Sequence, residues 1–262
     1  MSSYAVVIGV NHYVPPTKKG LKLLEGAIPD AEAIAKWLKE KAGLPENNIR
    51  LLISTTGLDK IIKNHVDTAI SEIIDEVIAA GGDADRLYFY FAGHGMGVEN
   101  DLDNNGLCLS NWTESMFNSA AMASGDYKRE LLTGGFFKEI VIWLDCCRNT
   151  TFNLRPQGGP GNNLRGVNNQ PKWFLAHATT YDTSAYETTY TTGALTEKRG
   201  IFTKVLLDGL NGAAGSGGRA IDALSLSDYL YIHVPKAAQQ AGFAQEPDIS
   251  HNTSAIKSIY FP

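Results

Sequence analysis

Five continuous apolar runs constrain the fold of this 262-residue chain more than any other feature of its sequence. A strand with one face in water alternates apolar and polar residues, whereas unbroken apolar runs are typical of strands buried on both faces of a sheet. The runs cover residues 4–10, 49–54, 86–92, 139–145 and 173–178. Apolar residues at helical spacing lie between them, as at 29–43 and 64–77. This alternation predicts an α/β fold in which helices cover both faces of a mostly parallel sheet.

The rest of the chain adds helices, a long loop and a last strand to this plan. We expect helices near 200–210 and 224–238, and a short final strand at 255–260 that brings the sheet to about six strands. The tract 150–172 is rich in Gly, Pro and Asn, has no periodicity and predicts an exposed loop, longer than an ordinary connection. One domain is expected over residues 1–262.

Charge and cysteine content exclude several classes of partner and site. A net charge of −5 and a pI near 5.7 argue against binding to nucleic acid or to a membrane surface. No apolar run approaches the roughly 20 residues that span a bilayer, and the first residues lack the pattern of a signal peptide, so we expect a cytoplasmic location. An odd number of cysteines in a long chain indicates free thiols in a reducing compartment.

Two of the apolar runs end on reactive side chains. His94 follows the run at 86–92, and Cys146 and Cys147 follow the run at 139–145. Parallel sheets bind ligands at the carboxyl ends of their strands, so residues placed there can reach a substrate. If these two strands are neighbours, His94 and Cys147 emerge side by side. The imidazole then supplies the thiolate and later protonates a leaving amine.

The surrounding residues fit nucleophilic catalysis. The glycines on either side of His94 allow a close approach to substrate, so the backbone N–H groups of Gly95 and Cys147 are expected to converge on a developing oxyanion. Side chains alternate along a strand, so one of the two adjacent cysteines faces the site and the other faces the core. Alternation with leucine predicts that Cys108 is a buried apolar residue.

Taken together, these residues resemble the caspase-like cysteine proteases. A Gly-His-Gly strand end is followed, about fifty residues later, by Asp-Cys-Cys-Arg at the end of the next strand. The resemblance is closest to the metacaspase and orthocaspase branch. It extends along nearly the whole chain, through the segments 4–13, 24–31, 185–187, 200–210 and 245–249.

The resemblance implies a caspase-like fold and an endopeptidase that needs no cofactor. In the metacaspase motif Asp-x-Cys the third residue is the nucleophile, which selects Cys147 and pairs it with His94. The family's division of the domain implies a large-subunit-like part at 1–149 and a small-subunit-like part at 173–262.

The resemblance also implies substrates that are proteins or peptides with Arg or Lys before the scissile bond. Asp145, together with Asp30 in the segment Gly-Ala-Ile-Pro-Asp-Ala, matches the acids of the metacaspase pocket, with Ala27 and Ala92 at neighbouring pocket positions. Two carboxylates in a desolvated pocket need a cation, and a substrate guanidinium supplies one with paired hydrogen bonds. The alternative for Asp30 is an acid that interacts with a helix N-terminus.

Some residues depart from the family pattern or extend it. Arg148 and Asn149 replace the usual His-Ser after the nucleophile, and Ala92 replaces a common Ser. None of these changes removes a catalytic group. Asp182 and Glu187, just after the run at 173–178, are candidates for the rim of the pocket.

The loop at 150–172 matches the region in which caspase relatives are cut during activation. Among its basic residues, Arg155 precedes a proline, whereas the Arg165–Gly166 bond is unhindered. We therefore expect a zymogen that processes itself after Arg165. An upstream activator is a further partner that this comparison leaves open.

A fragment of a calcium-binding motif occurs at Asp101, Asp103, Asn105 and Gly106. Position twelve of that template is Trp112, where a bidentate Glu is required. We interpret the segment as a turn and assign no metal ligands, while calcium activation at other acidic sites stays open.

The sequence thus predicts a cysteine endopeptidase that cleaves after Arg or Lys with Cys147 and His94. Two other classes stay open. One is a catalytically silent caspase-like scaffold, which the presence of both reactive residues disfavours. The other is a thiol redox protein that uses Cys146 and Cys147.

Overall fold

The computed structural model describes residues 2–13, 21–54, 60–151, 153–161, 165–168, 170–192, 195–215, 220–254 and 258–262. Its centre is a six-stranded sheet in the order β13-β9-β7-β3-β1-β2. The strands are β1 Ser3–Gly9, β2 Ile49–Ile53, β3 Ala84–Ala92, β7 Phe137–Asp145, β9 Lys172–His177 and β13 Asp248–His251. All neighbours pair in parallel except β13, which is antiparallel to β9. The predicted fold class is confirmed.

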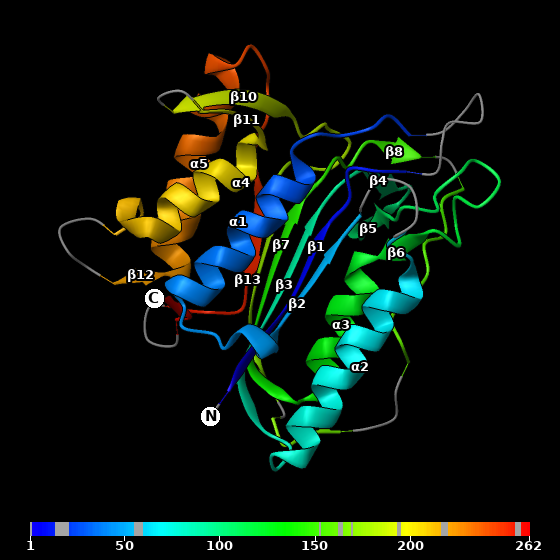
Figure 1. Cartoon of the computed structure of the whole chain (residues 1–262), viewed down its shortest axis with the longest axis vertical. Helices are drawn as coiled ribbons and strands as arrows, with labels where there is room; N and C mark the ends of the chain where they lie inside the picture. The colour runs from blue at the N-terminus through cyan, green and yellow to red at the C-terminus, as the bar shows by residue number, and fades with distance from the viewer. Residues whose placement is uncertain are drawn as a thin grey trace.

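Helices cover both faces of this sheet (Figure 1). One face carries α1 Ala27–Glu40, α4 Ile201–Asp208 and α5 Ala223–Gln240, and the other carries α2 Lys63–Ala79 and α3 Ser124–Gly134. Successive residues of β1 pack into opposite cores: Val6 and Ile8 lie in the cluster with α2, whereas Ala5 and Val7 lie in the cluster with α1. Burial on both faces explains why the strand is a continuous apolar run.

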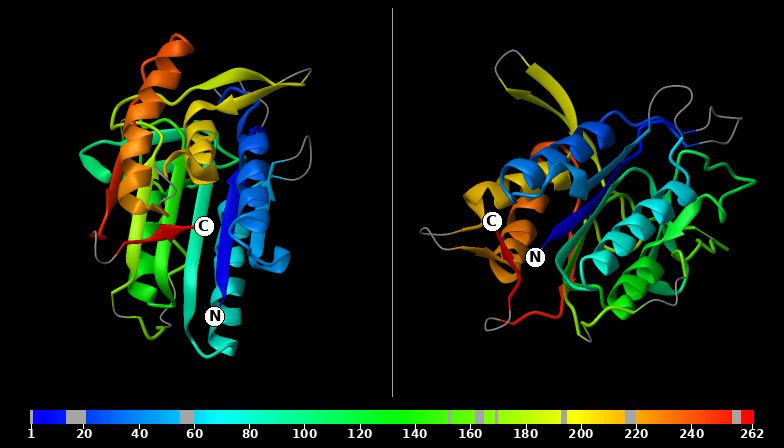
Figure 2. Two further views of the ribbon diagram at one scale, coloured as in Figure 1. Left: turned by 90° about the vertical axis from the view of Figure 1, so that its left-hand side faces the viewer. Right: turned by 60° about the horizontal axis from the view of Figure 1, so that its bottom comes forward.

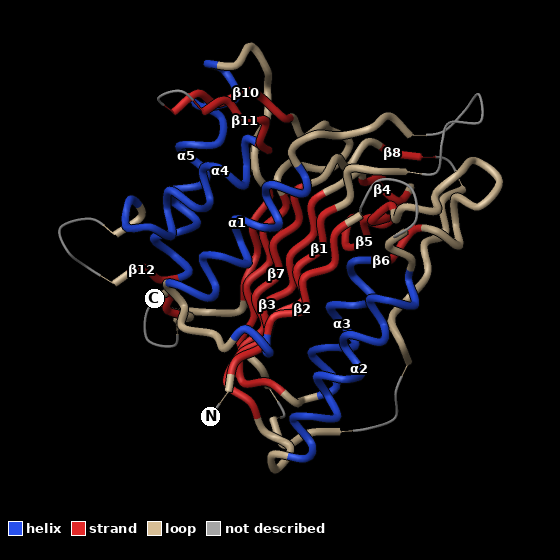
Figure 3. The backbone as a smooth tube through the Cα atoms, in the orientation of Figure 1, coloured by secondary structure: helices blue, strands red, loops and turns tan. Residues whose placement is uncertain are grey.

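A four-stranded sheet and a hairpin lie at the carboxyl edge of the central sheet (Figure 3). A four-stranded sheet contains β4 Gly95–Val98, β5 Asp101–Cys108, β6 Ala121–Ala123 and β8 Thr150–Thr151. The hairpin of β10 Glu187–Thr192 and β11 Leu195–Gly200 projects from the body of the protein (Figure 2). Two short pieces, β12 Ile221–Asp222 and β14 Tyr260–Phe261, pair with each other. A 3-10 turn at Glu46–Asn48 and a π-helical turn at Gly209–Ala213 complete the elements of the described residues.

The sixth strand of the sheet is not the one expected from the sequence. The strand predicted at 255–260 falls partly on 255–257, outside the described residues, and β14 does not join the central sheet. The sixth position belongs to β13, whose residues Asp-Ile-Ser-His are only partly buried. An edge strand needs no apolar run, because one of its edges and part of its faces stay in water.

The tract 150–172 is less exposed than its composition indicates. Leu154 is completely buried, and Gln157 exchanges backbone hydrogen bonds of 2.8 Å with Ala121 and Ala123 of β6. Further along, the N–H of Gly166 donates to the carbonyl of Gly134 at the end of α3 (2.8 Å). The expectation of an exposed loop therefore holds for residues such as Gln157 and Val167, whereas Leu154 is buried and backbone hydrogen bonds hold the tract against the domain.

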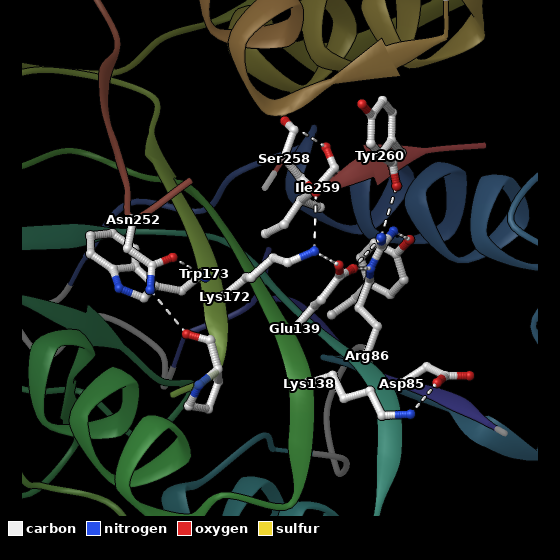
Figure 4. A network of polar contacts seen from close by, with 12 residues as sticks. Asp85, Arg86, Lys138, Glu139, Lys172, Trp173, Asn252, Ser258, Ile259 and Tyr260 are labelled. Atoms are coloured by element: carbon white, nitrogen blue, oxygen red, sulfur yellow. Dashed lines mark hydrogen bonds and ion pairs between the residues drawn. The ribbon is translucent and has the colours of Figure 1, made fainter. Parts of the chain in front are cut away.

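A charged network ties the last described residues to the amino end of the sheet (Figure 4). Arg86 of β3 donates to Glu139 of β7 and to the carbonyl of Tyr260. Lys172 of β9 donates to the other oxygen of Glu139 (3.1 Å) and to the carbonyl of Ser258 (3.2 Å). The network lies at the end of the sheet opposite His94 and Cys147, and one carboxylate, that of Glu139, is shared by two cations. No helix of the described chain has the length and hydrophobicity needed to cross a membrane.

Candidate active site

A cavity of about 300 Å³ opens at the carboxyl edge of the central sheet. Its walls come from the segment that leads into α1, from the ends of β3 and β7, and from the residues around the base of the β10–β11 hairpin. The cavity is lined by the predicted residues Ala27, Asp30, Ala92, His94, Asp145, Cys147 and Glu187, whereas the predicted oxyanion donor Gly95 is not among its lining residues. The fold thus brings the reactive thiol, the imidazole and both carboxylates to one site.

His94 is held from two sides. Its Nε2 lies 2.8 Å from the carbonyl oxygen of Lys22, which can only accept, so Nε2 carries the proton and Nδ1 is left free as a base. Its backbone N–H donates to the Tyr13 hydroxyl at 2.7 Å, and the two rings lie 5.0 Å apart. Burial lowers the pKa of the imidazole, so His94 is neutral at pH 7.

Cys147 faces the cavity, whereas Cys146 faces the core. Cys147 Sγ lies 3.4 Å from the backbone nitrogen of Ala185 and 3.5 Å from its carbonyl oxygen. Cys146 is buried, and its sulfur accepts a hydrogen bond from Asn105 Nδ2 at 3.1 Å. Burial raises the pKa of the Cys147 thiol, so the free site holds a thiol beside a neutral imidazole and not a preformed ion pair.

Gly95 packs directly against the turn that carries the nucleophile. A Cβ at this position would lie 2.4 Å from the carbonyl oxygen of Cys147 and 2.7 Å from Cys146 Sγ. These distances are far too short for a real contact, so the close approach of the two strand ends requires a glycine here.

Asp30 and Asp145 meet at the N-terminus of α4. Asp30 Oδ2 accepts the N–H of Gly200 (2.7 Å), and Asp145 Oδ2 accepts the N–H and the hydroxyl of Thr203 (3.1 and 2.6 Å). Burial raises the pKa of both carboxyls, that of Asp145 to about 6, and the nearby Asp145 raises the pKa of Asp30 further. Asp30 also lies in the first turn of α1, so both roles considered for it are compatible with its position.

The comparison with known proteins decides the family. A family model described as the caspase domain matches residues 2–256. The chain belongs to the caspase domain family. This family contains cysteine-type endopeptidases.

Two curated relatives carry protease names. A probable protease of a Desulfuromonadales bacterium is 28% identical over 233 residues, which cover 82% of this chain and 27% of that protein. Metacaspase-8 of Arabidopsis thaliana is 31% identical over 110 residues, which cover 40% of this chain and 27% of that protein. The matched residues therefore span only about a quarter of the length of each relative.

Solved structures share the fold at low sequence identity. A crystallised protein of Geobacter sulfurreducens has a TM-score of 0.62 and 16% identity, covering 100% of this chain and 98% of its own. Caspase-1 from Spodoptera frugiperda has a TM-score of 0.54 and 14% identity, covering 95% of this chain and 85% of its own. The expected caspase-like fold is confirmed.

Two contacts of this caspase domain's site could not be read from its sequence. The Lys22 carbonyl that orients His94 belongs to a segment without any motif. Arg199 of β11 pairs through Nε with Asp30 Oδ1 at 2.5 Å, and its side chain is almost fully buried. Both pocket acids were expected to bind the cationic side chain of a substrate. For Asp30, the chain itself supplies the cation.

The residues proposed for the rim divide into two groups. Glu187 lines the cavity and accepts the N–H groups of Glu25 and Gly26, which clamps the hairpin to the segment before α1. Asp182 lies outside the cavity and accepts the N–H and hydroxyl of Thr150 (2.8 and 2.7 Å), so it braces the turn after the nucleophile.

Arg148, which directly follows Cys147, is buried. It donates to Asp248 at the start of β13 (2.6 Å) and to the carbonyl of Leu102 (2.7 Å). Arg148 thus joins the residue after the nucleophile to the edge strand of the sheet.

The fragment that resembles a calcium-binding motif is part of a strand. Asp101–Cys108 forms β5, and the turn expected there lies just before it, at 99–100. Asn105 Nδ2 donates to Cys146 Sγ and to the carbonyl of Cys147. Within the described residues, no group of three or more His, Cys, Asp or Glu side chains is arranged to hold a metal ion.

Proposed function

We propose that this caspase domain hydrolyses peptide bonds on the carboxyl side of Arg or Lys, with Cys147 as nucleophile and His94 as general base. The observation that carries the proposal is the shared cavity, which places a partly buried thiol and an imidazole with a free Nδ1 beside two carboxylates. The family membership supports a peptidase, and the acids support a basic side chain before the scissile bond.

The chemistry follows from the protonation states. His94 Nδ1 takes the thiol proton while Sγ attacks the scissile carbonyl carbon, and the tetrahedral intermediate places its oxyanion near the N–H groups of Gly95 and Cys147. The imidazolium then gives its proton to the leaving amine, the C–N bond breaks and an acyl thioester remains. Water, activated by His94, hydrolyses the thioester and regenerates the thiol.

The Lys22 carbonyl contributes to this cycle by fixing the imidazole. Because the Lys22 carbonyl accepts a hydrogen bond from Nε2–H, the imidazole keeps the tautomer in which Nδ1 is basic. The same carbonyl stabilises the positive charge that appears on the ring during proton transfer. This support does not require an acidic third residue.

Specificity for Arg or Lys is proposed on the buried acids. Asp145 and Asp30 line the cavity beside Cys147, and no arginine among the described residues lines that cavity to receive an acidic substrate residue. A carboxylate in such an enclosed site binds a guanidinium or ammonium strongly because water competes poorly there.

The proposed reaction needs no cofactor, and the only role considered for calcium is regulation. Calcium dependence is tested by measuring peptide cleavage with calcium chloride and with a chelator in parallel. The second candidate, a silent scaffold with this fold, is disfavoured by the presence of thiol, imidazole and Gly95 together.

Peptide hydrolysis tests the proposal directly. The wild-type protein and Cys147→Ala are compared on fluorogenic peptides that end in Arg, Lys or Asp, with Cys108→Ala as a matched control that removes a buried thiol away from the cavity. We expect cleavage of the Arg and Lys peptides by wild type and Cys108→Ala only. Absence of cleavage by wild type with and without calcium would favour the scaffold.

An arginyl chloromethyl ketone gives a second readout that does not depend on turnover. The expected result is one covalent adduct on Cys147 by mass spectrometry. A thiol count that drops by two on mild oxidation and returns on reduction would instead support the redox protein with Cys146 and Cys147.

A further inference from the structure

One of the two pocket acids already has a cation. Along β11, Lys198 and Gly200 line the cavity while Arg199 between them does not. Arg199 reaches Asp30 from behind the cavity wall and pairs with Oδ1, and Gly200 donates its N–H to Oδ2. Both oxygens of Asp30 are therefore occupied by the chain itself.

Asp145 is differently placed. Its Oδ2 takes both hydrogen bonds from Thr203, and its Oδ1 accepts none from the described part of the chain. Gly200 separates the two acids: a Cβ there would lie 2.3 Å from Asp145 Oδ2 and 2.8 Å from Asp30 Oδ2. Two carboxylates this close to one glycine repel each other, and without a counter-ion one of them would hold a proton near neutral pH.

The Arg199 pair is not explained by stability alone. Buried ion pairs contribute little net stability because desolvation offsets the attraction. This one also leaves Arg199 Nη2 buried without an acceptor in the described residues, while Nη1 reaches Glu197 at only 3.3 Å. The pair is better explained by its effect on the charge of the pocket.

We propose that Arg199 is a specificity-determining residue of this peptidase: as the resident counter-ion of Asp30, it leaves Asp145 as the one carboxylate that accepts the basic side chain of a substrate. The proposal rests on the proposed function and assigns different roles to the two acids. Asp145 contacts the substrate cation, whereas Asp30 holds Arg199 and so sets the net charge behind the pocket.

A double-mutant cycle separates the two roles. Asp30→Asn removes the buried carboxylate that compensates the charge of Arg199 beside the pocket, so KM for an Arg peptide is expected to rise about tenfold or more. Arg199→Met leaves two unpaired acids, of which one stays protonated. The double variant Asp30→Asn with Arg199→Met removes both charges and keeps Asp145, so its KM returns to within about threefold of wild type. If Asp30 itself binds the substrate, the double variant stays as impaired as Asp30→Asn, which would overturn the proposal.

The pH profile gives the readout that a merely structural role would not move. The charged and titratable groups around the acids include Tyr90, Cys146, Cys147, Glu187, Tyr190, Glu197, Lys198 and Arg199. In Arg199→Met, KM for the Arg peptide is expected to exceed that of wild type about tenfold at pH 6 and to match or fall below it at pH 8.5, where both acids ionise. An equal change of kcat at every pH would contradict the proposal.

Controls keep the test independent of folding and of the general activity. Lys204→Met removes a nearby positive charge whose partner is the exposed Asp208, and it should leave the pH profile unchanged. Arg199→Lys keeps the positive charge and should retain most of the wild-type pH profile. If Arg199→Met does not fold, Arg199→Lys is measured in its place. A tenfold change of KM in Arg199→Lys at pH 8.5 would count against the proposal. If the wild-type protein cleaves no basic peptide, the proposed function is wrong. If the wild type cleaves and Arg199→Met has the same pH profile of KM as the wild type, only the role proposed for Arg199 is wrong.

Discussion

Ala92 at the end of β3 lies directly opposite Asp145 at the end of β7 in the parallel pairing of the two strands. The backbone continues this alignment, because the N–H of Gly93 donates to the Asp145 carbonyl (3.2 Å). His94 and Cys147 each follow two residues later, so the register of one strand pair decides that they reach the same cavity.

The first prediction concerns which thiol reacts. Cys147→Ala should reduce kcat/KM by at least about 10³-fold, since the nucleophile is lost. Cys108→Ala should keep activity near wild type and lower the free energy of unfolding by about 1 kcal/mol, because a buried sulfur leaves a small cavity. Steady-state kinetics and urea unfolding measure the two effects. Retained activity in Cys147→Ala would exclude the proposed mechanism.

The second prediction is an acid limb in the pH profile. Asp145 must be ionised to bind a cation, and its pKa is raised to about 6, so KM for an Arg peptide should rise as pH falls below about 6. His94 must be neutral to act as a base, and burial lowers its pKa, so kcat should hold until lower pH than an ordinary histidine allows. Separate measurement of kcat and KM from pH 5 to 8 checks both. A KM that is flat across this range would contradict the role of Asp145.

The third prediction is a trade between stability and activity at Asp145. Its folded pKa, about 6, lies above the unfolded value of 3.8, so the folded state binds the proton more tightly and the protein gains stability as pH falls from 7 to 5. Asp145→Asn removes the buried charge and should raise the free energy of unfolding at pH 7 by about 1–3 kcal/mol, while the Arg peptide is no longer cleaved efficiently. Chemical unfolding at pH 5 and 7 tests the sign: a wild-type protein that loses as much stability as the variant, or more, when the pH falls from 7 to 5 would contradict the prediction.

The sequence predicted those parts of the fold whose residues are completely buried. It did not predict contacts that form only when distant segments meet in the folded chain. The apolar runs at 86–92 and 139–145 reported a two-sided core, and their abrupt ends at His94 and Cys147 pointed to the cavity. Nothing of this kind marks Arg199, because its importance comes from the hairpin that carries it behind Asp30.

Other misses have the same origin. The sixth strand, β13, is partly exposed and has no periodic pattern, so the apolar signal that identifies central strands was absent. The Lys22 carbonyl is a backbone group, and any side chain at that position presents the same oxygen to His94. Residues of these two kinds are found only when the tertiary arrangement is known.

The fourth prediction concerns the anchor behind the nucleophile. Asp248→Asn removes the charged partner of the buried Arg148 and should lower the free energy of unfolding by about 1–3 kcal/mol, less than for a fully buried pair because Asp248 is partly exposed. Asp208→Asn, which breaks an exposed pair with Lys204, should cost less than about 0.5 kcal/mol. Equal effects of the two changes in urea unfolding would show that Arg148 is not stabilised by Asp248.

The fifth prediction is that cleavage after Arg165 occurs between molecules. Gly166 is hydrogen-bonded to Gly134, which precedes β7, whereas Cys147 follows the other end of this nine-residue strand. At about 3.3 Å per residue, the strand keeps the Arg165–Gly166 bond about 25–30 Å from the nucleophile of the same molecule. A Cβ on Gly166 would lie 2.3 Å from the Gly135 carbonyl oxygen, so this segment packs tightly against the end of α3. Full-length Cys147→Ala should therefore be cut after Arg165 when wild-type enzyme is added, at a rate proportional to enzyme concentration, while the additional change Arg165→Gln prevents the cut. Wild-type self-cleavage with a half-life independent of protein concentration would instead require the segment to leave α3 and reach the cavity of its own molecule.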